Sequence, residues 1–179
     1  HTHDVFVIAA FRDGAQKHQI SSARGIAYPG TVMVIPPGVV HTGESAHKDT
    51  GWSYSAFYPS AQILTQISMN LFGDNRGSLD FGTTYMIEDK TLAERLLYAS
   101  DIAHDCADIL KRQEAVYNAF ELLIRRYGRR SCQLAVSRRD LAPVHKGLEF
   151  MRANLRQSLK IQDIAAAAEL SEFHFMRLF

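Results

Sequence analysis

The first third of the chain alternates apolar and polar residues with a period of two. After His1 and His3, apolar residues continue at Val5, Val7 and Phe11, which is the spacing of a half-buried β-strand beginning at the first residues. Short apolar runs follow, separated by turn-prone Asp13-Gly14, Pro29-Gly30 and Pro36-Pro37-Gly38. The pattern predicts short strands over residues 3–58 arranged as a barrel or a sandwich, with residues 85–87 returning as one more strand.

From residue 60 the apolar spacing changes to three and four, which predicts helices. A short helix over 60–71 and a turn-rich stretch over 73–82 precede two longer helices, over 90–103 and 110–127. The second has an apolar stripe of about five turns, which is more than a small barrel needs to cover. Packing on the barrel and dimerisation are both open uses of this stripe, and dimerisation is favoured because readers of tandem DNA half-sites are usually symmetric. The stripe consists of Leu110, Gln113, Tyr117, Phe120, Ile124 and Tyr127.

The C-terminal pattern is that of two short helices joined by a three-residue turn. A supporting helix is predicted from Val144 to about Leu155, and a second apolar stripe runs from Ile161 to Leu170. Ser171 then stands where a helix N-cap belongs, because its hydroxyl can accept hydrogen bonds from the free N–H groups of the next turn. This arrangement predicts a helix-turn-helix, whose second helix enters the major groove of DNA.

Composition and charge narrow the class of protein. The 179 residues are 46% hydrophobic and 22% charged, and no apolar run is long enough to cross a bilayer, so no membrane partner is expected. Two cysteines without metal-type spacing favour a cytoplasmic protein. The first 120 residues carry nine Lys and Arg against thirteen Asp and Glu, whereas the remaining 59 carry eleven against six. A basic C-terminal third suits a polyanion such as DNA, although a solvated helix face would look the same.

Two spacings in the β region match the motifs of cupin barrels. They are His1-x-His3-x3-Val7-x6-Gly14 and Gly30-x5-Pro36-x-Gly38-x2-His41. Strand alternation places His1, His3 and Val7 on one face, which would point into the barrel. His41 would join the two other histidines there. Val7 stands where metal-binding cupins have Glu, so the carboxylate ligand is missing.

Taken together, these motifs resemble an AraC/XylS-type transcriptional regulator. Beside the cupin spacings and the helix-turn-helix, the resemblance rests on Gly51-Trp52-Ser53-Tyr54 and Tyr58-Pro59. It implies an α+β fold class: an N-terminal cupin-like β-barrel, a helical hairpin and a partial all-α helix-turn-helix segment. The implied domains are an effector-binding barrel over 1–88, a dimerisation hairpin over 89–130, a linker over 131–143 and a truncated DNA-binding domain over 144–179.

The function implied by the resemblance is ligand-responsive control of transcription, without catalysis. A small-molecule effector would bind in the barrel, and nothing in the sequence selects among a sugar, an amino acid and an aromatic acid. The implied partners are double-stranded operator DNA for the parent protein and a second copy of the chain, with RNA polymerase open as a further partner. The expected effector residues are His3, Val5, Met33, His41, Trp52 and Tyr54. The expected base-contacting residues are Phe173, Met176 and Arg177, with Phe175 and Phe179 packing inward.

Three departures from the regulator pattern concern the DNA-binding segment. Glu169 occupies a turn position where Gly is usual, so a non-Gly residue is expected at positive φ. Lys160 replaces a capping Ser or Thr, so the helix after it is expected to start without a side-chain cap. The second helix-turn-helix of such regulators is absent, so this segment is expected to bind DNA poorly while still folding and binding its effector.

The barrel leaves the question of a metal open. No cofactor is expected, but His1, His3 and His41 are a workable ligand set for a divalent first-row metal, since neutral imidazole is a common ligand. The alternative function is therefore a metal-dependent cupin enzyme of the dioxygenase or isomerase type, using these three ligands. A further alternative is a sensor or dimerisation module without its DNA-binding part. The enzyme alternative gives no purpose to residues 144–179 or to the basic C-terminal third.

Overall fold

In the computed structural model the chain forms two compact units. The first comprises residues 1–132 and the second residues 133–179. The structure describes residues 1–47, 49, 51–73, 78–82, 84–131 and 138–178. Residues 132–137, in the first half of the expected linker, lie outside the described residues, as does Phe179. Within the described residues, no helix has the length and apolar character needed to span a membrane.

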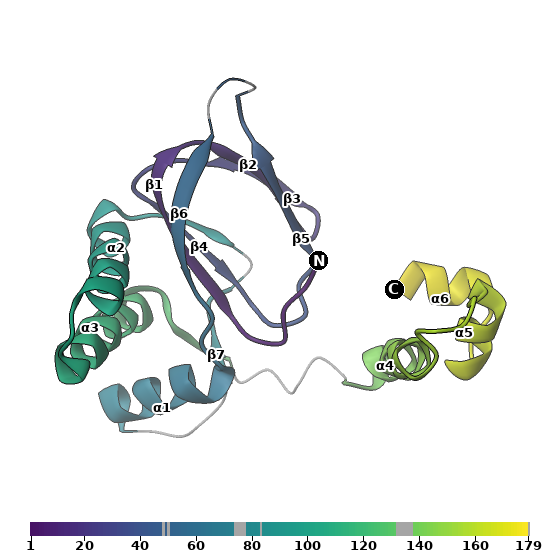
Figure 1. Ribbon diagram of the computed structural model, residues 1–179. Coiled ribbons are helices and arrows are strands. Elements are labelled where there is room, and N and C mark those ends of the chain that lie inside the picture. Colours follow the sequence, from purple (N-terminus) through teal and green to yellow (C-terminus); the bar gives the residue numbers. More distant parts are fainter. Residues whose placement is uncertain (48, 50, 74–77, 83, 132–137, 179) are drawn as a thin grey trace. The chain divides into compact units, whose positions relative to one another are not determined.

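Unit 1 contains a barrel-like arrangement of two antiparallel sheets. One sheet has the strand order β6-β1-β4-β8 and the other has the order β3-β2-β5. Figure 1 shows the two sheets facing each other across the barrel interior. A small sheet of β7 and β9 completes the unit. The strands are β1 (Val7–Gly14), β2 (Gln16–Ile20), β3 (Ala23–Ala27), β4 (Thr31–Ile35), β5 (His41–Ser45), β6 (Trp52–Phe57), β7 (Ser78–Asp80), β8 (Met86–Glu88) and β9 (Arg129–Ser131).

Strand β1 is buried on both faces because it separates two hydrophobic cores. Its residues Val7, Ala9 and Phe11 point into the barrel interior, where they pack with residues such as Met33. The intervening Ile8 and Ala10 belong to a second core that includes residues of the helices. Alternation along a strand sends neighbouring side chains to opposite faces. The continuous apolar run of β1 is thus explained by its central position.

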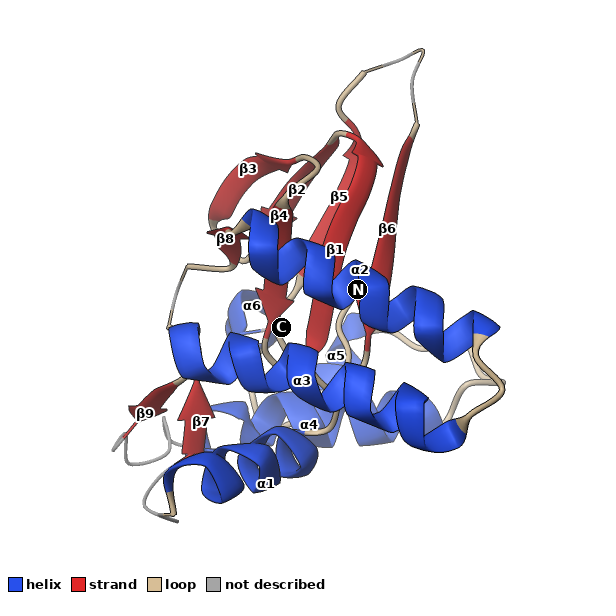
Figure 2. Ribbon diagram, turned by 90° about the vertical axis from the view of Figure 1, so that its left-hand side faces the viewer, coloured by secondary structure: helices blue, strands red, loops and turns tan. Residues whose placement is uncertain are grey.

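Three helices pack beside the outer face of the sheet that contains β1: α2 lies against the sheet, α3 packs on α2, and α1 packs on α3 and β7 (Figure 2). They are α1 (Ala61–Phe72), α2 (Lys90–Asp105) and α3 (Ile109–Tyr127). Side chains cap each N-terminus: Ser60 caps α1, Asp89 caps α2 and Asp108 caps α3. The hairpin of α2 and α3 therefore shares its core with the barrel and lies in the same compact unit.

The apolar stripe of α3 divides into two parts. Phe120 and Ile124 are buried in the core of unit 1, so packing on the barrel accounts for this C-terminal half. Leu110, at the N-terminal end, is 72% exposed. Packing on the barrel thus concerns the C-terminal half of α3, and the N-terminal end is left for the expected dimerisation.

Unit 2 contains α4 (Arg138–Ala153), α5 (Ile161–Ala167) and α6 (Glu172–Leu178). Its core includes Ile164, Ala165, Ala168 and Phe175, with Met151 of α4 packed against it. Because α4 begins at Arg138, part of the segment expected as a linker is helical.

The turn between α5 and α6 has the features predicted from the sequence. Glu169 has φ +59°, which is the left-handed region. The side chain of Lys160 does not cap α5; the backbone N–H of Lys160 instead donates to Asp163. Ser171 caps α6, since its hydroxyl accepts from the backbone N–H of His174 at 3.3 Å.

The prediction of a strand at the first residues is wrong, because β1 begins only at Val7. The preceding segment bonds to loops and to the start of β5 instead of joining the ladder of β1. The carbonyl of His1 accepts from the N–H of His41, that of His3 accepts from Gly38, and the N–H of Phe6 donates to Pro59. Further along, β7 lies within the stretch expected to be turns, and β8 is the predicted returning strand, shifted by one residue.

Candidate effector-binding cavity

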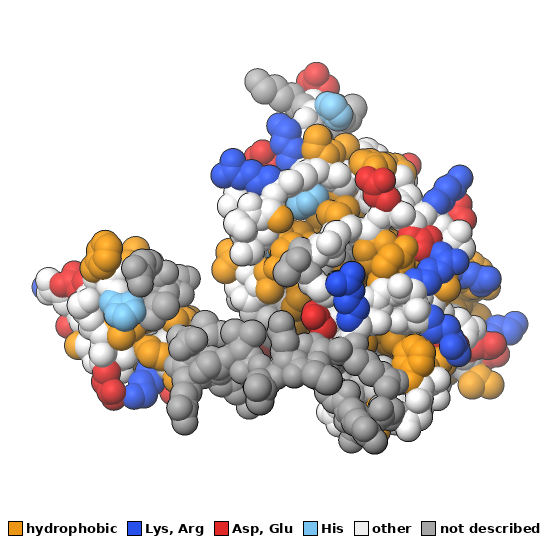
Figure 3. Space-filling view, turned by 180° about the vertical axis from the view of Figure 1, so that it is seen from behind, with side chains coloured by type: hydrophobic (Ala, Val, Ile, Leu, Met, Phe, Trp, Pro, Cys, Tyr) orange, Lys and Arg blue, Asp and Glu red, His pale blue; other side chains and the backbone are white. Residues whose placement is uncertain are grey.

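The interior of the barrel contains a cavity of about 160 Å³. Engineered protein cavities of about 150 Å³ admit a molecule of the size of benzene, so this cavity has room for a compact molecule. Its residues come from β1, β2, β4, β5 and β6 and from the segments that flank them. They are His1, His3, Val7, Ala9, Phe11, Gln16, Met33, Ile35, His41, Thr42, Gly43, Trp52, Tyr54 and Tyr58. Figure 3 shows that unit 1 is hollowed on the face seen from behind, with a histidine and hydrophobic side chains visible in the hollow.

Three histidines gather at one end of this cavity. The ring centroids of His1 and His41 are 4.3 Å apart, and those of His3 and His41 are 5.3 Å apart. One potential ligand nitrogen from each ring lies within 4.8 Å of those of the other two. Tyr58 adjoins the group, with its ring centroid 5.3 Å from that of His3. The sequence prediction that the three histidines converge is therefore confirmed by the geometry.

Backbone hydrogen bonds hold this histidine end in place. The N–H of His41 donates to the carbonyl of His1 at 3.1 Å, and the N–H of Gly38 donates to the carbonyl of His3 at 2.8 Å. Nδ1 of His41 lies 3.0 Å from the carbonyl oxygen of Val39. A neutral imidazole that donates from Nδ1 presents the lone pair of Nε2, which is how many metal-binding histidines are oriented.

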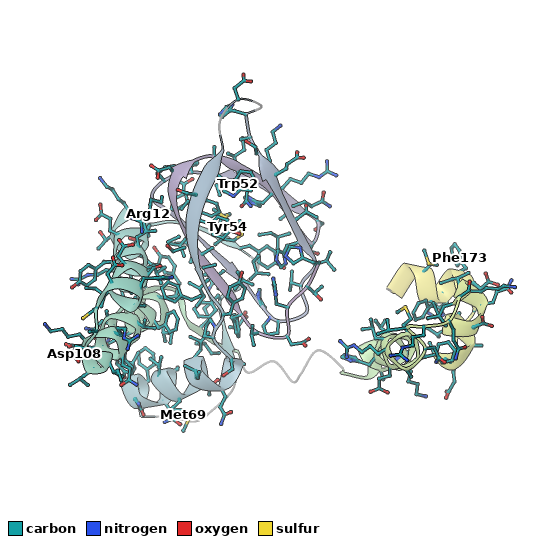
Figure 4. The ribbon with its side chains drawn as sticks, viewed as in Figure 1. Arg12, Trp52, Tyr54, Met69, Asp108 and Phe173 are labelled. Carbon is teal, nitrogen blue, oxygen red and sulfur yellow. The ribbon has the colours of Figure 1, made fainter. Side chains whose placement is uncertain are left out.

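The other end of the cavity is formed around Trp52. In the strand register, Gly14 of β1 pairs with Trp52 and Phe11 pairs with Tyr54, whereas Val7 near the histidines lies at the opposite end of β1. Figure 4 labels Trp52 and Tyr54 on the same strand, β6. Nε1 of Trp52 is fully buried and has no hydrogen-bond partner among the described residues. An indole N–H can only donate, so it lacks an acceptor.

The amide of Gln16 lies over Gly43 of β5, a diagonal neighbour without a side chain, since the residue directly opposite Gln16 is Ser45. A Cβ added to Gly43 would lie 2.0 Å from Nε2 of Gln16, so the amide occupies the space that any larger residue would need. A glycine inside a strand often marks such a close approach. The absence of a side chain at Gly43 thus leaves space for the polar amide of Gln16 in the cavity wall.

The described lining residues of the cavity include no Asp, Glu, Lys or Arg. The polar groups are imidazoles, hydroxyls, one amide and one indole. On the next inward position of β2, His18 is 8% exposed, and Nδ1 is buried without a partner. Burial lowers the pKa of His18 below its ordinary value of 6.5, because a desolvated imidazole disfavours the charged form. The described lining thus contributes no carboxylate, ammonium or guanidinium group to the cavity.

Five of the six expected effector residues line the cavity: His3, Met33, His41, Trp52 and Tyr54. Val5 does not, because it precedes β1 and the strand alternation used to place it does not extend that far. Gln16 and Tyr58 were missed. Gln16 could have been found from its spacing of two with His18 and Ile20 on the same strand.

The surface of α6 shows how the expected DNA-contacting residues lie. Phe173, labelled in Figure 4, is 79% exposed and Met176 is 62% exposed, whereas Phe175 is buried at 2%. The predicted inward packing of Phe175 is confirmed. Arg177 belongs to α6, but its side chain lies outside the described part of the structure.

Comparisons with known proteins agree with this architecture. The family model for the AraC-like ligand binding domain matches residues 1–139. The structure of the AraC-like transcriptional activator CuxR is similar, with a TM-score of 0.50 and 14% sequence identity over 99% of this chain and 61% of CuxR. Apo ToxT from Vibrio cholerae is similar with a TM-score of 0.53 and 9% identity, over 98% of this chain and 66% of ToxT.

These similarities differ in what they show. The chain spans less than two thirds of the length of each of these two proteins, and at such low identity the structural likeness shows the fold alone. No curated protein sequence matches the chain significantly. The family model covers well over half of the chain and is the stronger finding. The chain therefore belongs to the family of proteins with an AraC-like ligand binding domain.

Proposed function

We propose that the chain is part of a ligand-responsive transcriptional regulator, in which an effector bound in the barrel controls DNA binding by the C-terminal helix-turn-helix. The observation that carries the proposal is the presence, in one chain, of a barrel with an interior cavity and of a two-helix unit with an exposed second helix. Family membership supports it. The protein would act in the cytoplasm, where operator DNA is accessible, and without catalysing a reaction.

The proposed effector site consists of the cavity residues His3, Met33, His41, Trp52 and Tyr54, with Gln16 and Tyr58 added from the geometry. Val5 stays outside the proposal, because it does not line the cavity. Effector pockets are typically apolar with a few placed polar groups, and this cavity has that composition.

The experiment that tests the effector site is a thermal-shift screen of the chain with sugars, amino acids and aromatic acids. A ligand present at 100 times its dissociation constant adds about 2.7 kcal/mol of stability. Met33→Trp, which fills the cavity, should abolish the shift, whereas Ile26→Trp on exposed strand β3 should leave it unchanged. An absence of any shift across all three classes would count against a ligand sensor.

DNA contact is proposed through Phe173, Met176 and Arg177 of α6. The exposure of the first two supports this assignment, since buried side chains could not reach base edges. Apolar side chains contact the methyl group of thymine, and an Arg can bind guanine through two hydrogen bonds.

We expect Arg177→Ala to weaken binding to selected operator DNA far more than binding to random DNA. The loss of a bidentate contact costs about 1–3 kcal/mol of discrimination. Competition titrations with operator and random duplexes at one fixed salt concentration measure both affinities. Equal losses on the two DNAs would remove the base-contacting role. Arg152→Ala, on α4, serves as the control for general charge.

Homodimerisation is proposed through the exposed N-terminal end of α3, where Ile109 and Leu110 are 62% and 72% exposed. A symmetric dimer would place two copies of α6 on a repeated DNA site. RNA polymerase remains a further proposed partner, without a surface assigned to it.

A second candidate property is a divalent metal bound by His1, His3 and His41. The convergence of their nitrogens and the orientation of His41 favour it. The ring nitrogens lie within 4.8 Å of one another, and zinc–nitrogen bonds are about 2.0–2.1 Å long, so the three rings would have to move closer together to share one ion. The three imidazoles are a donor set that would suit a divalent first-row metal.

Zinc or manganese titrated into chelator-treated protein, followed by calorimetry, tests this candidate. We expect one ion per chain for the wild type and none for His3→Ala, with His104→Ala on α2 as a matched control. Stoichiometric metal together with turnover of a substrate would instead favour the enzyme alternative. Absence of binding would remove the metal without affecting the regulator.

A further inference from the structure

Unit 1 has a second concavity, outside the barrel, in the form of a groove between α1 and the N-terminal half of α3. Figure 2 shows these two helices side by side, and the groove has a volume of about 840 Å³. Its described lining comes from the end of β6 and the residues after it, from α1, from the end of α2 and from α3. The described linings of the groove and of the barrel cavity have Tyr58 as their one common residue. A molecule in the groove would therefore leave the barrel cavity free.

The floor of the groove is apolar and belongs to the core of unit 1. Ile67 and Phe120 line it and are 6% and 5% exposed, and Phe57 packs edge-on against Phe120 with ring centroids 5.6 Å apart. Toward the rim, Ile63 and Ile109 are 53% and 62% exposed. Ligand sites are typically about 300–1,000 Å³ in volume and lined by hydrophobic and aromatic side chains. The groove thus has the size and the lining of a site for a molecule with an extended apolar body.

Arg112 of α3 is the one charged residue in the described lining of the groove. It is half-buried, and its guanidinium makes no ion pair or hydrogen bond with the described residues. Asp108 begins the same helix, but its carboxylate accepts from backbone N–H groups of α3 instead of from Arg112. No acidic residue stands in the first turn of α3, where the helix dipole favours negative charge. An anion beside Arg112 would gain a charge-assisted hydrogen bond and a favourable interaction with the dipole.

We propose that the groove binds a free amphiphile with an extended apolar body and one anionic group, the body lying between α1 and α3 and the anion pairing with Arg112. This inference goes beyond the proposed function, because it places a ligand site outside the effector barrel. The occupant is a free molecule and not a bilayer, since the apolar floor lies in a concavity that the flat surface of a bilayer does not enter.

Three probes separate the charge of the ligand from its apolar body. Decanoate has a long chain and an anion, decyltrimethylammonium has a chain of the same length and a cation, and hexanoate has the anion on a shorter chain. Dissociation constants are measured by calorimetry on the whole chain, with every probe below the concentration at which it forms micelles. We expect decanoate to bind roughly tenfold more tightly than decyltrimethylammonium and at least roughly tenfold more tightly than hexanoate.

Arg112→Gln removes the charge and retains a polar side chain. It should bring the affinities for decanoate and decyltrimethylammonium to within about twofold of each other. Arg95→Gln is the matched control, because Arg95 is an exposed arginine of α2 outside the lining of the groove, and it should leave the preference for decanoate unchanged. Met33→Trp, which fills the barrel cavity, should leave decanoate binding unchanged as well.

Methyl resonances of the unaltered chain locate the ligand without any substitution. In a ¹H–¹³C spectrum, decanoate should shift the methyl groups of Ile63, Ile67 and Val116, which line the groove. The methyl group of Met33, which lines the barrel cavity, should stay in place. This measurement tests the site even if Arg112→Gln fails to fold.

The other occupants of the groove give distinct results, each of which would overturn the inference. Equal affinities for decanoate and decyltrimethylammonium, or an unchanged preference in Arg112→Gln, would remove the pairing with an anion. An affinity for decanoate that falls as the chain concentration rises would show that a second copy fills the groove. Binding to phosphatidylglycerol vesicles without binding of free decanoate would assign the groove to a membrane surface.

The same experiments keep this inference separate from the proposed function. A shift of Met33 in place of Ile63 would assign decanoate to the barrel, which would overturn the groove site and support the effector site. Inert decanoate, together with a metabolite that binds in the barrel, would remove the groove site alone. Decanoate in the groove, together with no barrel ligand in the thermal-shift screen, would leave the groove site and count against the effector site.

Discussion

At the scale of single residues, the features that matter most are polar groups without partners. Nδ1 of His18 is buried and unbonded on the inner face of β2. A Cβ added to Gly25, its partner on β3, would lie 2.9 Å from the His18 ring, so the imidazole is held tightly against that strand. The ring is therefore packed against β3, with its Nδ1 out of contact with solvent.

We predict that His18 makes the barrel less stable in acid. Because burial lowers the pKa of His18 below 6.5, the unfolded chain binds the proton more readily than the folded chain. The free energy of unfolding should therefore fall as the pH drops below about 6.5, the ordinary pKa. Urea titrations at pH 8 and pH 5.5, followed by Trp52 fluorescence, measure this change. His18→Phe should reduce the pH dependence, and an unchanged dependence would show that other groups cause it.

At the scale of elements, Asp89 connects the start of α2 to the end of α3. Its carboxylate accepts from the backbone N–H of Leu92 at 3.0 Å, from Arg126 at 2.6 Å and from the hydroxyl of Tyr127 at 2.9 Å. Burial by itself would raise the pKa of Asp89, but these three hydrogen bonds and the charge of Arg126 outweigh it and lower the pKa below 3.8. The hairpin is thus closed by one ionised side chain.

We predict that Asp89→Ala destabilises unit 1 by about 1–2 kcal/mol through loss of the cap alone. The cost should exceed that of Asp108→Ala, because Asp108 caps α3 with backbone contacts only. A lowered carboxyl pKa contributes stability above pH 3.8, and that contribution is lost as the pH falls through the folded-state pKa. Urea midpoints of both variants at pH 7 and pH 3 provide the measurement. Equal costs at pH 7 would show that the bonds to Arg126 and Tyr127 contribute nothing.

In unit 2, the contact between α4 and α6 depends on Gly147. A Cβ at this position would lie 2.4 Å from Cε2 of Phe175, which is buried. Replacing Gly by Ala in a helix normally gains about 0.5–1 kcal/mol, but overpacking a core costs about 1–3 kcal/mol. Packing should prevail, so Gly147→Ala should destabilise the helix-turn-helix.

Hydrogen exchange measured by mass spectrometry on the whole chain checks this prediction. Peptides from α4, α5 and α6 should exchange faster in Gly147→Ala, while peptides from the barrel remain unchanged. Adding Phe175→Leu, which shortens the clashing side chain, should restore part of the protection. Slower exchange in the single variant would mean that helix propensity prevails over packing.

At the scale of the whole molecule, the apolar surface left at the start of α3 predicts self-association. Leu110→Glu should weaken a dimer, because a charge would be placed in an apolar contact. Sedimentation velocity over a range of concentrations measures the effect, and Ile26→Glu on β3 is a control of similar exposure. A wild-type chain that stays monomeric at all concentrations would contradict the proposed dimer.

The sequence predicted the order of elements well where local chemistry determines them. The cap at Ser171, the positive φ of Glu169 and the convergence of three histidines follow from residue types and spacing. The starting point of β1 was not predictable in this way, because the first residues bond to segments far along the chain. Gln16 was missed although its spacing of two with His18 and Ile20 indicates the inner face; what the spacing cannot show is that its amide lies over Gly43 of another strand.

Strand β1 alone separates the interior of the barrel from the core formed with the helices. Phe11 and Ala9 face the space where a ligand would sit, and Ile8 and Ala10 face the helices that carry the proposed dimer surface. Arg12, at the end of the buried run, is bonded to Asp101 of α2 at 2.5 Å. A ligand that displaced Ala9 or Phe11 would also displace Ile8 and Ala10, which pack in the core that includes α2. We therefore expect the first sign of a filled barrel to be altered hydrogen exchange in α2.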